Sequence, residues 1–248
     1  MAFRPVDIAR KLGISTTTLR KYEEFGLVPL VSRSESGYRM YTTEHIAYFV
    51  CVREMLAGFS LTDISKLMKE VMDKKIDAAL WMANCAQAEL HQEKLISKKI
   101  IQNLGSITKQ EVRSHRKNPK ITAERKLTIN DVSSETGIPV TTIRYWDKVG
   151  LISAERCSSN NYRMFTAFHI RQVLTIYALK FSALVSRHKH SIEKIKEQLK
   201  EFDYNDRTMI TKMTNEIDRY LNKVNRDQIT GIAALYHLCV QVETNNFG

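Results

Sequence analysis

The chain has 248 residues, of which 43% are hydrophobic and 26% charged, a balance typical of folded proteins and not of disordered ones. This length leaves room for two domains, and the formal net charge of +11 favours a polyanionic partner, with nucleic acid ahead of an acidic membrane surface. No run of about 18 apolar residues is present, which excludes a membrane-spanning helix, and no cysteine pair of the C-x-x-C type supports a zinc site.

The first elements are predicted to be two short helices joined by a tight turn. Residues 3–12 have apolar side chains at helical spacing, Gly13 allows the chain to reverse, and Ser15 or Thr16 is placed to cap the second helix. Its core-facing side chains are predicted to be Leu19, Tyr22 and Phe25. Its outward side chains are predicted to be Thr16, Thr17, Arg20 and Lys21. This arrangement of side chains is typical of a recognition helix, which enters the DNA major groove.

A small hairpin, or wing, is predicted to follow the recognition helix. Extended runs at residues 27–30 and 38–41 flank a turn-rich tip at residues 33–37. Thr42 then caps a third helix, and Ser60 caps a fourth.

One long helix is predicted from residue 76 to residue 104, with an apolar stripe of imperfect heptad spacing. The stripe is compatible with a helix packed on its own domain, but it fits an antiparallel coiled-coil arm better. The following segment carries seven basic and two acidic side chains and forms a linker. The first half is therefore divided into a winged helix-turn-helix domain at 1–72, a long pairing helix at 73–108 and a basic linker at 109–126.

The second half of the chain repeats the first. Gly137 follows Gly13 by 124 residues (137 − 13 = 124), and Arg144 follows Arg20 by the same number (144 − 20 = 124), with no gap needed through the second wing. This fixed register indicates internal duplication. After the third helix the offset becomes 131 (191 − 60 = 131), and a second, shorter long helix is expected at residues 205–224. The second half is divided into a domain at 127–202 and C-terminal helices at 203–248.

The second module is predicted to present its own DNA-contacting side chains. Its recognition helix contributes Thr141, Thr142, Arg144 and Tyr145. The bases of the two wings contribute Tyr38, Arg39, Tyr162 and Arg163. Tyr22 and Trp146 either reach a phosphate with the polar atom of the ring or belong to the core, and the pattern leaves both alternatives open. Arg33 adds a charge to the first wing, whereas Cys157 stands at the matching place in the second, so a weaker phosphate grip is expected there.

Two motifs carry a family resemblance. The first is Thr18-Leu19-Arg20-x-Tyr22-Glu23-x-x-Gly26-Leu27-x-Pro29 with Gly37-Tyr38-Arg39-x-Tyr41. The second is Thr142-Ile143-Arg144-Tyr145-Trp146-Asp147-x-x-Gly150-Leu151 with Tyr162-Arg163-x-Phe165. Both resemble the DNA-binding module of the MerR family of bacterial transcription regulators. The resemblance implies a mainly α fold, with two winged helix-turn-helix domains that are each followed by a long helix of the antiparallel coiled-coil type.

The resemblance also implies partners. Members of the family typically dimerise, bind a pseudo-palindromic promoter, and bend and untwist it so that RNA polymerase can use it. We therefore expect double-stranded DNA and RNA polymerase as partners. The long helices are expected to pair either within one chain, as a pseudo-dimer, or between two chains, as a homodimer. This chain departs from the family plan, because it holds two modules and no sizeable effector domain follows either.

The leading hypothesis is a sequence-specific transcription regulator that binds and distorts promoter DNA, located in the cytoplasm and associated with the nucleoid. One alternative is an architectural or recombination accessory protein, and another is a drug or metabolite sequestering protein on the same scaffold. An enzyme is not expected, because the sequence offers no nucleophile–base pair and no phosphate-binding glycine loop. No cofactor or metal is expected either, since Cys85 has no second cysteine nearby to complete a soft-metal site.

Overall fold

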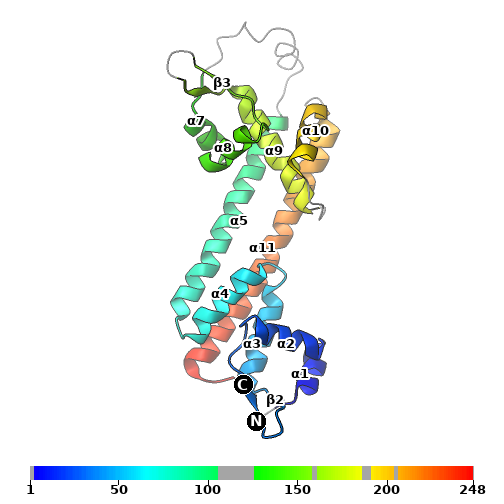
Figure 1. Ribbon diagram of the computed structural model, residues 1–248, viewed down its shortest axis with the longest axis vertical. Helices are drawn as coiled ribbons and strands as arrows, with labels where there is room; N and C mark the ends of the chain where they lie inside the picture. Colours follow the sequence, from blue (N-terminus) through cyan, green and yellow to red (C-terminus); the bar gives the residue numbers. More distant parts are fainter. Residues whose placement is uncertain (1–2, 106–125, 158–160, 186–190, 204–205, 248) are drawn as a thin grey trace. The chain divides into compact units, whose positions relative to one another are not determined.

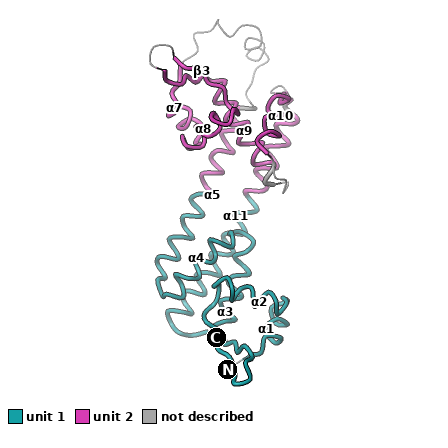
Figure 2. The backbone as a smooth tube through the Cα atoms, in the orientation of Figure 1, with its two compact units in different colours: residues 1–90, 222–248 teal, residues 91–221 magenta. Residues whose placement is uncertain are grey.

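The computed structural model describes residues 3–105, 126–157, 161–185, 191–203 and 206–247. The predicted linker at 109–126 lies almost entirely outside these residues. The described chain is mainly helical, as expected, and divides into two compact units (Figures 1 and 2). Unit 1 comprises residues 1–90 and 222–248, and unit 2 comprises residues 91–221. Among the described residues, no helix combines the length and the apolar character needed to cross a membrane.

Unit 1 begins with a winged helix-turn-helix module, which we call module 1. Its elements are α1 (Pro5–Leu12), α2 (Thr16–Glu24), β1 (Ser32–Arg33), β2 (Arg39–Met40), α3 (Thr43–Met55) and α4 (Leu61–Met72). Gly13 ends α1 in the left-handed conformation, with a φ of 63°. The Ser15 hydroxyl then accepts a hydrogen bond of 3.0 Å from the backbone N–H of Thr18 and caps α2. The predicted helix–turn–helix is therefore present.

Two local expectations for module 1 are wrong. Phe25 does not face the core: it is the C-terminal cap of α2 and is 52% exposed. The first wing strand does not occupy residues 27–30, because Leu27 and Val28 are buried in the core and fix the chain there. The antiparallel pairing with β2 therefore begins later, at β1, where the backbone has left the core.

Side chains cap the remaining helices of module 1 as predicted. The Thr42 side chain caps α3, and the Nδ1 atom of His45 accepts a hydrogen bond of 3.0 Å from the Thr42 backbone N–H. His45 thereby fills the place that Glu usually has in a capping box. The Ser60 hydroxyl caps α4 by accepting a bond of 3.1 Å from the backbone N–H of Asp63.

Unit 2 contains the second winged module, which we call module 2. Its elements are α7 (Ile129–Thr136), α8 (Val140–Lys148), β3 (Glu155–Arg156), β4 (Arg163–Met164), α9 (Ala167–Val185) and α10 (Ile192–Glu201). The bridge between Leu127 and Phe165 repeats the bridge between Phe3 and Tyr41 at the offset of 124 (127 − 3 = 165 − 41 = 124). The duplication read from the sequence is thus also a duplication of structure.

The two long helices are α5 (Ile76–Gly105) and α11 (Arg207–Thr244), of 30 and 38 residues. The expectation of a shorter second helix at residues 205–224 is wrong, because the apolar segment that follows continues the same helix. The starts of α5 and α11 are 131 residues apart (207 − 76 = 131), which equals the offset between the caps Ser60 and Ser191. The repeat therefore extends through the long helices.

Within each unit, a segment of α5 pairs with a segment of α11 (Figure 1). In unit 1, Gln87 donates a hydrogen bond of 2.6 Å to the side chain of Gln228, and Val242 lies beside Ile76 in a shared pocket wall, so the two segments run antiparallel. In unit 2, Lys94 forms an ion pair with Asp218. The antiparallel pairing expected for the long helices is thus made inside one chain.

Each long helix packs against the module that it does not follow in sequence. In unit 1, a Cβ atom on Gly58 would lie 2.5 Å from the backbone nitrogen of Gln228, so α11 contacts the turn between α3 and α4. In unit 2, the Lys99 ammonium donates a bond of 3.1 Å to the Ser134 carbonyl of α7, on the side of α5 that also carries buried Ile96.

Candidate nucleic-acid interface

The outward face of α2 presents the polar and basic side chains predicted for DNA contact in module 1. Leu19 is fully buried and anchors the opposite face. Thr17, Arg20 and Lys21 are exposed, and Thr16 is half-buried. Because α2 begins directly after the tight turn, these side chains lie on the part of the helix that, in DNA-binding helix-turn-helix proteins, meets base edges and phosphates.

The outward face of α8 also exposes threonine and arginine side chains, but it has a tyrosine at the place of a lysine. Thr141 and Arg144 are exposed, Thr142 is half-buried, and Ile143 is buried on the inner face. Tyr145, at the place of Lys21, is 50% exposed. One module therefore offers an ammonium group where the other offers an aromatic ring with a hydroxyl, and the two differ in the bonds that they can make to DNA.

Tyr22 and Trp146, for which the sequence allowed either a phosphate contact or a place in the core, lie in the core. Trp146 is 1% exposed, and the Lys180 ammonium lies 5.5 Å from the centre of its ring. Tyr22 is also buried, and its ring centre lies 6.1 Å from that of Phe49. Burial raises the pKa of the Tyr22 hydroxyl. Both residues thus support the recognition helices from within, and neither belongs to the surface that would meet a phosphate.

An ion pair joins each wing to its recognition helix. The Arg39 guanidinium donates a hydrogen bond of 2.6 Å to the Glu23 carboxylate, and this bond raises the pKa of Arg39. Arg163 pairs with Asp147 in module 2. These arginines were predicted as phosphate ligands, but each holds a carboxylate of its own module. Since a guanidinium has five N–H groups, the remaining donors stay available to a phosphate.

The wing strands correct the register of the repeat. β1 pairs Arg33 with Arg39, whereas β3 pairs Arg156 with Arg163. Arg33 donates a bond of 3.2 Å to the Gly37 carbonyl, and Arg156 donates one of 3.1 Å to the Asn161 carbonyl. The counterpart of Arg33 is therefore Arg156.

The predicted equivalence between Arg33 and Cys157 is consequently wrong. Cys157 takes the place of Ser34, because its backbone N–H bonds the carbonyl of Tyr162 at 2.8 Å just as that of Ser34 bonds Tyr38 at 2.8 Å. The connection before the second wing is one residue shorter and the tip is one residue longer, so the two changes cancel in a gapless alignment. The second wing thus keeps a basic side chain. The expectation that it binds phosphate more weakly than the first wing rested on the wrong alignment and no longer has support.

The residue that ends each wing tip is left-handed, and the tyrosine that follows it is exposed. Gly37 has a φ of 81°, and Asn161 adopts the same left-handed region with a φ of 57°. Asn tolerates this conformation better than other non-glycine residues, which confirms the expectation for the second tip. Tyr38 and Tyr162 are 71% and 72% exposed.

In module 2 the recognition helix and the wing border one groove of about 820 Å³. Arg144 lines it from α8, and Arg156 and Arg163 line it from the wing. The start of α7 closes the groove with Thr128 and Asn130. Three arginines on one concave surface favour a polyanion such as a DNA backbone. Among the described residues, no group of three or more potential metal-ligating side chains competes with this assignment.

Comparisons with known proteins agree with this geometry. The family model described as "MerR HTH family regulatory protein" matches residues 3–71 and 127–201. A mercuric resistance operon regulatory protein of Bacillus cereus is 39% identical over 69 residues, covering 27% of this chain and 52% of that protein. The transcriptional regulator CueR of Salmonella typhi is 36% identical over 74 residues, covering 29% of this chain and 54% of that protein. The chain thus spans about half the length of these relatives.

A solved structure also matches: HiNmlR, a MerR family regulator lacking the sensor domain, bound to promoter DNA. It shares 27% identity, covers 43% of this chain and 97% of its own, and has a TM-score of 0.29.

The fold and the site define a mainly α protein with two winged helix-turn-helix modules in tandem. The family model covers more than half of the chain, in two segments that each hold one complete module, and the chain belongs to the MerR family.

Proposed function

We propose that this chain is a sequence-specific regulator of transcription that binds and distorts double-stranded promoter DNA used by RNA polymerase. The observation that carries the proposal is the repeated surface, in which an exposed arginine of the recognition helix accompanies a basic wing. Arg20 and Arg33 form this surface in module 1, and Arg144 and Arg156 form it in module 2. The names of the matched relatives support the same function.

We further propose that one chain carries both halves of a DNA-reading head as a pseudo-dimer. The support is that the helices which would pair two subunits already pair within the chain, through Gln87 with Gln228 in unit 1 and Lys94 with Asp218 in unit 2. Because Lys21 and Tyr145 differ at matching places, the two halves of the DNA site are expected to differ in sequence.

The test is fluorescence anisotropy with labelled fragments from upstream of the coding region, at several salt concentrations. We expect tight binding whose affinity falls steeply with salt, because Lys and Arg contacts release counterions from phosphates. Arg20→Ala and Arg144→Ala should each cost about 1–3 kcal/mol of binding free energy. Arg226→Ala, which removes an exposed arginine of α11 that lies outside both recognition helices and wings, is the matched control. Absence of binding at low salt would refute the proposal.

A further inference from the structure

Helix α11 continues past the residue that corresponds to the last described residue of α5. It is eight residues longer than α5 (38 − 30 = 8). At the offset of 131, the last residue of α5, Gly105, corresponds to Tyr236 (105 + 131 = 236). We call residues 237–247 the C-terminal extension.

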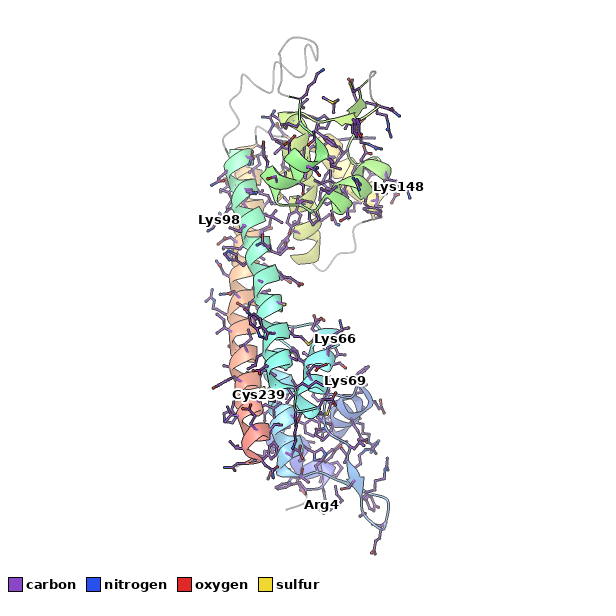
Figure 3. The ribbon with its side chains drawn as sticks, turned by 90° about the vertical axis from the view of Figure 1, so that its left-hand side faces the viewer. Arg4, Lys66, Lys69, Lys98, Lys148 and Cys239 are labelled. Atoms are coloured by element: carbon purple, nitrogen blue, oxygen red, sulfur yellow. The ribbon has the colours of Figure 1, made fainter. Side chains whose placement is uncertain are left out.

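The C-terminal extension packs on module 1 within unit 1. Leu238 and Cys239 are 1% exposed and Val242 is 7% exposed, and all three belong to the same core as α3. The two ends of the described chain lie together in this unit, and Cys239 lies on the part of α11 beside module 1 (Figures 1 and 3). The C-terminal extension thus contributes buried side chains to the core of module 1, although it belongs to the helix that follows module 2 in the sequence.

A pocket of about 360 Å³ opens between the C-terminal extension and module 1. Ile46, Val50 and Leu238 give it apolar walls, and Phe247 closes one side. Its volume falls in the range of about 300–1,000 Å³ that is usual for sites of small molecules. Of the four α11 residues that line it, His237, Leu238 and Gln241 belong to the C-terminal extension, so the extension forms this side of the pocket.

Two basic side chains lie at the edge of the pocket. Lys11 of α1 and His237 of the extension line it, and both side chains are exposed. Within the part of the chain that the structure describes, neither makes a hydrogen bond or an ion pair through its side chain. Among the described residues that line the pocket there is no carboxylate, and Thr43 and Gln241 add uncharged polar groups. Apolar walls with basic groups at the edge complement a molecule with an apolar body and an acidic group.

We propose that this pocket binds a small amphipathic anion. Its apolar body contacts Ile46, Val50 and Leu238, and its acidic group lies at Lys11 and His237. Cys51 also lines the pocket, but burial raises the pKa of its thiol to about 12, so the thiol stays protonated at neutral pH. The ligand is therefore held without a covalent bond.

Binding at this pocket is suited to regulation of module 1. The occupant would contact α3 directly and α1 through Lys11, and these helices support the recognition helix α2. This regulatory reading rests on the proposed function, whereas the binding itself does not. The experiment below is therefore made without DNA, so that a failure of DNA binding leaves its outcome unchanged.

Two dyes test the pocket: the anion 8-anilinonaphthalene-1-sulfonate and its uncharged analogue N-phenyl-1-naphthylamine, titrated against the full chain by fluorescence. Ala47→Trp and Ala234→Trp fill the pocket from opposite walls. Each is expected to weaken both dyes by about tenfold or more, since a filled pocket excludes the apolar body. Lys11→Gln with His237→Gln should weaken the anion by about threefold or more and leave the uncharged dye unchanged.

Lys66→Gln is the matched control, because Lys66 is an exposed lysine of α4 that does not line the pocket (Figure 3). It should change neither titration, and circular dichroism verifies that each variant is folded. Wild-type affinity in a folded tryptophan variant would overturn the site. Equal loss of both dyes in the Lys11→Gln, His237→Gln variant, or no loss of either, would overturn the assignment of an anion. Since Lys11 and His237 are exposed, this variant reports even where a tryptophan variant does not fold.

Discussion

At the scale of single residues, Arg156 gives the wing of module 2 the basic side chain that the sequence alignment did not predict there. It extends from β3 and donates to the Asn161 carbonyl, as Arg33 does to the Gly37 carbonyl. A charge on an exposed wing can reach a phosphate beside the groove that the recognition helix enters. Each wing therefore has one arginine at the same place in its first strand, although a gapless alignment of the two sequences sets Cys157 opposite Arg33.

Arg156→Ala should consequently weaken DNA binding to about the same degree as Arg33→Ala. We expect a loss of about fivefold in each case, together with a reduction of the salt slope by about one, as for removal of one phosphate contact. The measurement is anisotropy across a salt series. Arg219→Ala, on an exposed face of α11, serves as the control. An unchanged affinity in Arg156→Ala, with a loss in Arg33→Ala, would contradict the corrected register.

His45 gives module 1 a sensitivity to acid. Burial lowers the pKa of this histidine from its usual 6.5, and the backbone of Leu30 and Pro29 together with the carboxylates of Glu44 and Glu23 offsets only part of that effect. Its Nδ1 atom accepts the Thr42 N–H, so protonation there also removes this reciprocal bond of the capping box. The unfolded chain then binds the proton more tightly than the folded chain. Stability is therefore complete above the unfolded pKa and decreases as the pH falls below about 6.5.

His45→Asn should remove this part of the acid sensitivity, because an amide oxygen can accept the same N–H without titrating. Thermal unfolding of both proteins at pH 7.5 and pH 5.5 measures the effect. We expect the difference between the two pH values to be smaller in the variant. A difference of wild-type size would mean that other groups cause the acid sensitivity.

At the scale of elements, the pairing of α5 with α11 depends on close contacts with the modules. Gly58 and Gly231 allow these contacts in unit 1. An added Cβ would lie 2.5 Å from the backbone of Gln228 at Gly58, but 3.1 Å from the Met55 Cα atom and the Phe59 ring at Gly231. The clash at Gly58 is the more severe of the two, because all three of the nearest atoms there are backbone atoms of α11. The docking of α11 on module 1 is therefore more sensitive at Gly58.

Gly58→Ala should thus destabilise the protein more than Gly231→Ala. We expect roughly 2–3 kcal/mol for the former and about 1 kcal/mol or less for the latter, since overpacking a tight contact forces backbone shifts. Urea unfolding of the two variants and the wild type measures the difference. Equal stability of the two variants would show that α11 does not rest on the turn between α3 and α4.

The sequence predicted the elements far better than their edges. Periodic apolar positions located the helices, and cap residues such as Ser15 and Thr42 identified where helices begin. The wing strands were displaced, because two residues of pairing leave no periodic signal. The length of α11 was missed since its apolar face changes partner along the helix, from α5 in both units to module 1 in unit 1.

The candidate site was predictable in part for similar reasons. Outward side chains such as Arg20 and Arg144 follow from helical spacing, which also placed Leu19 and Ile143 inside. The partner of an arginine does not follow from spacing. The pairs of Arg39 with Glu23 and of Arg163 with Asp147 depend on how the wing folds back on the recognition helix. The repetition of an acid and an arginine at one offset was the signal available for them.

At the scale of the whole molecule, the pairing inside one chain predicts a monomer on an asymmetric site. Light scattering of the free protein should give the mass of one chain, 28.7 kDa. Hydroxyl-radical footprinting should show two protected stretches of different sequence. Arg20→Ala should weaken protection of one stretch and Arg144→Ala that of the other, because each arginine belongs to a different module. A dimer that protects a symmetric site would refute the pseudo-dimer.

The internal pairing of α5 with α11 has a consequence for how a cell would use such a protein. A regulator assembled from two separate subunits fills its site with a dependence on concentration that approaches the second power when subunits are scarce, because each must first find its partner. In the proposed pseudo-dimer one chain carries both heads and needs no such encounter, so occupancy would rise in direct proportion to the number of molecules. Each head of the proposed pseudo-dimer would also be free to accumulate its own substitutions, and either half of its DNA site could diverge without disturbing the other.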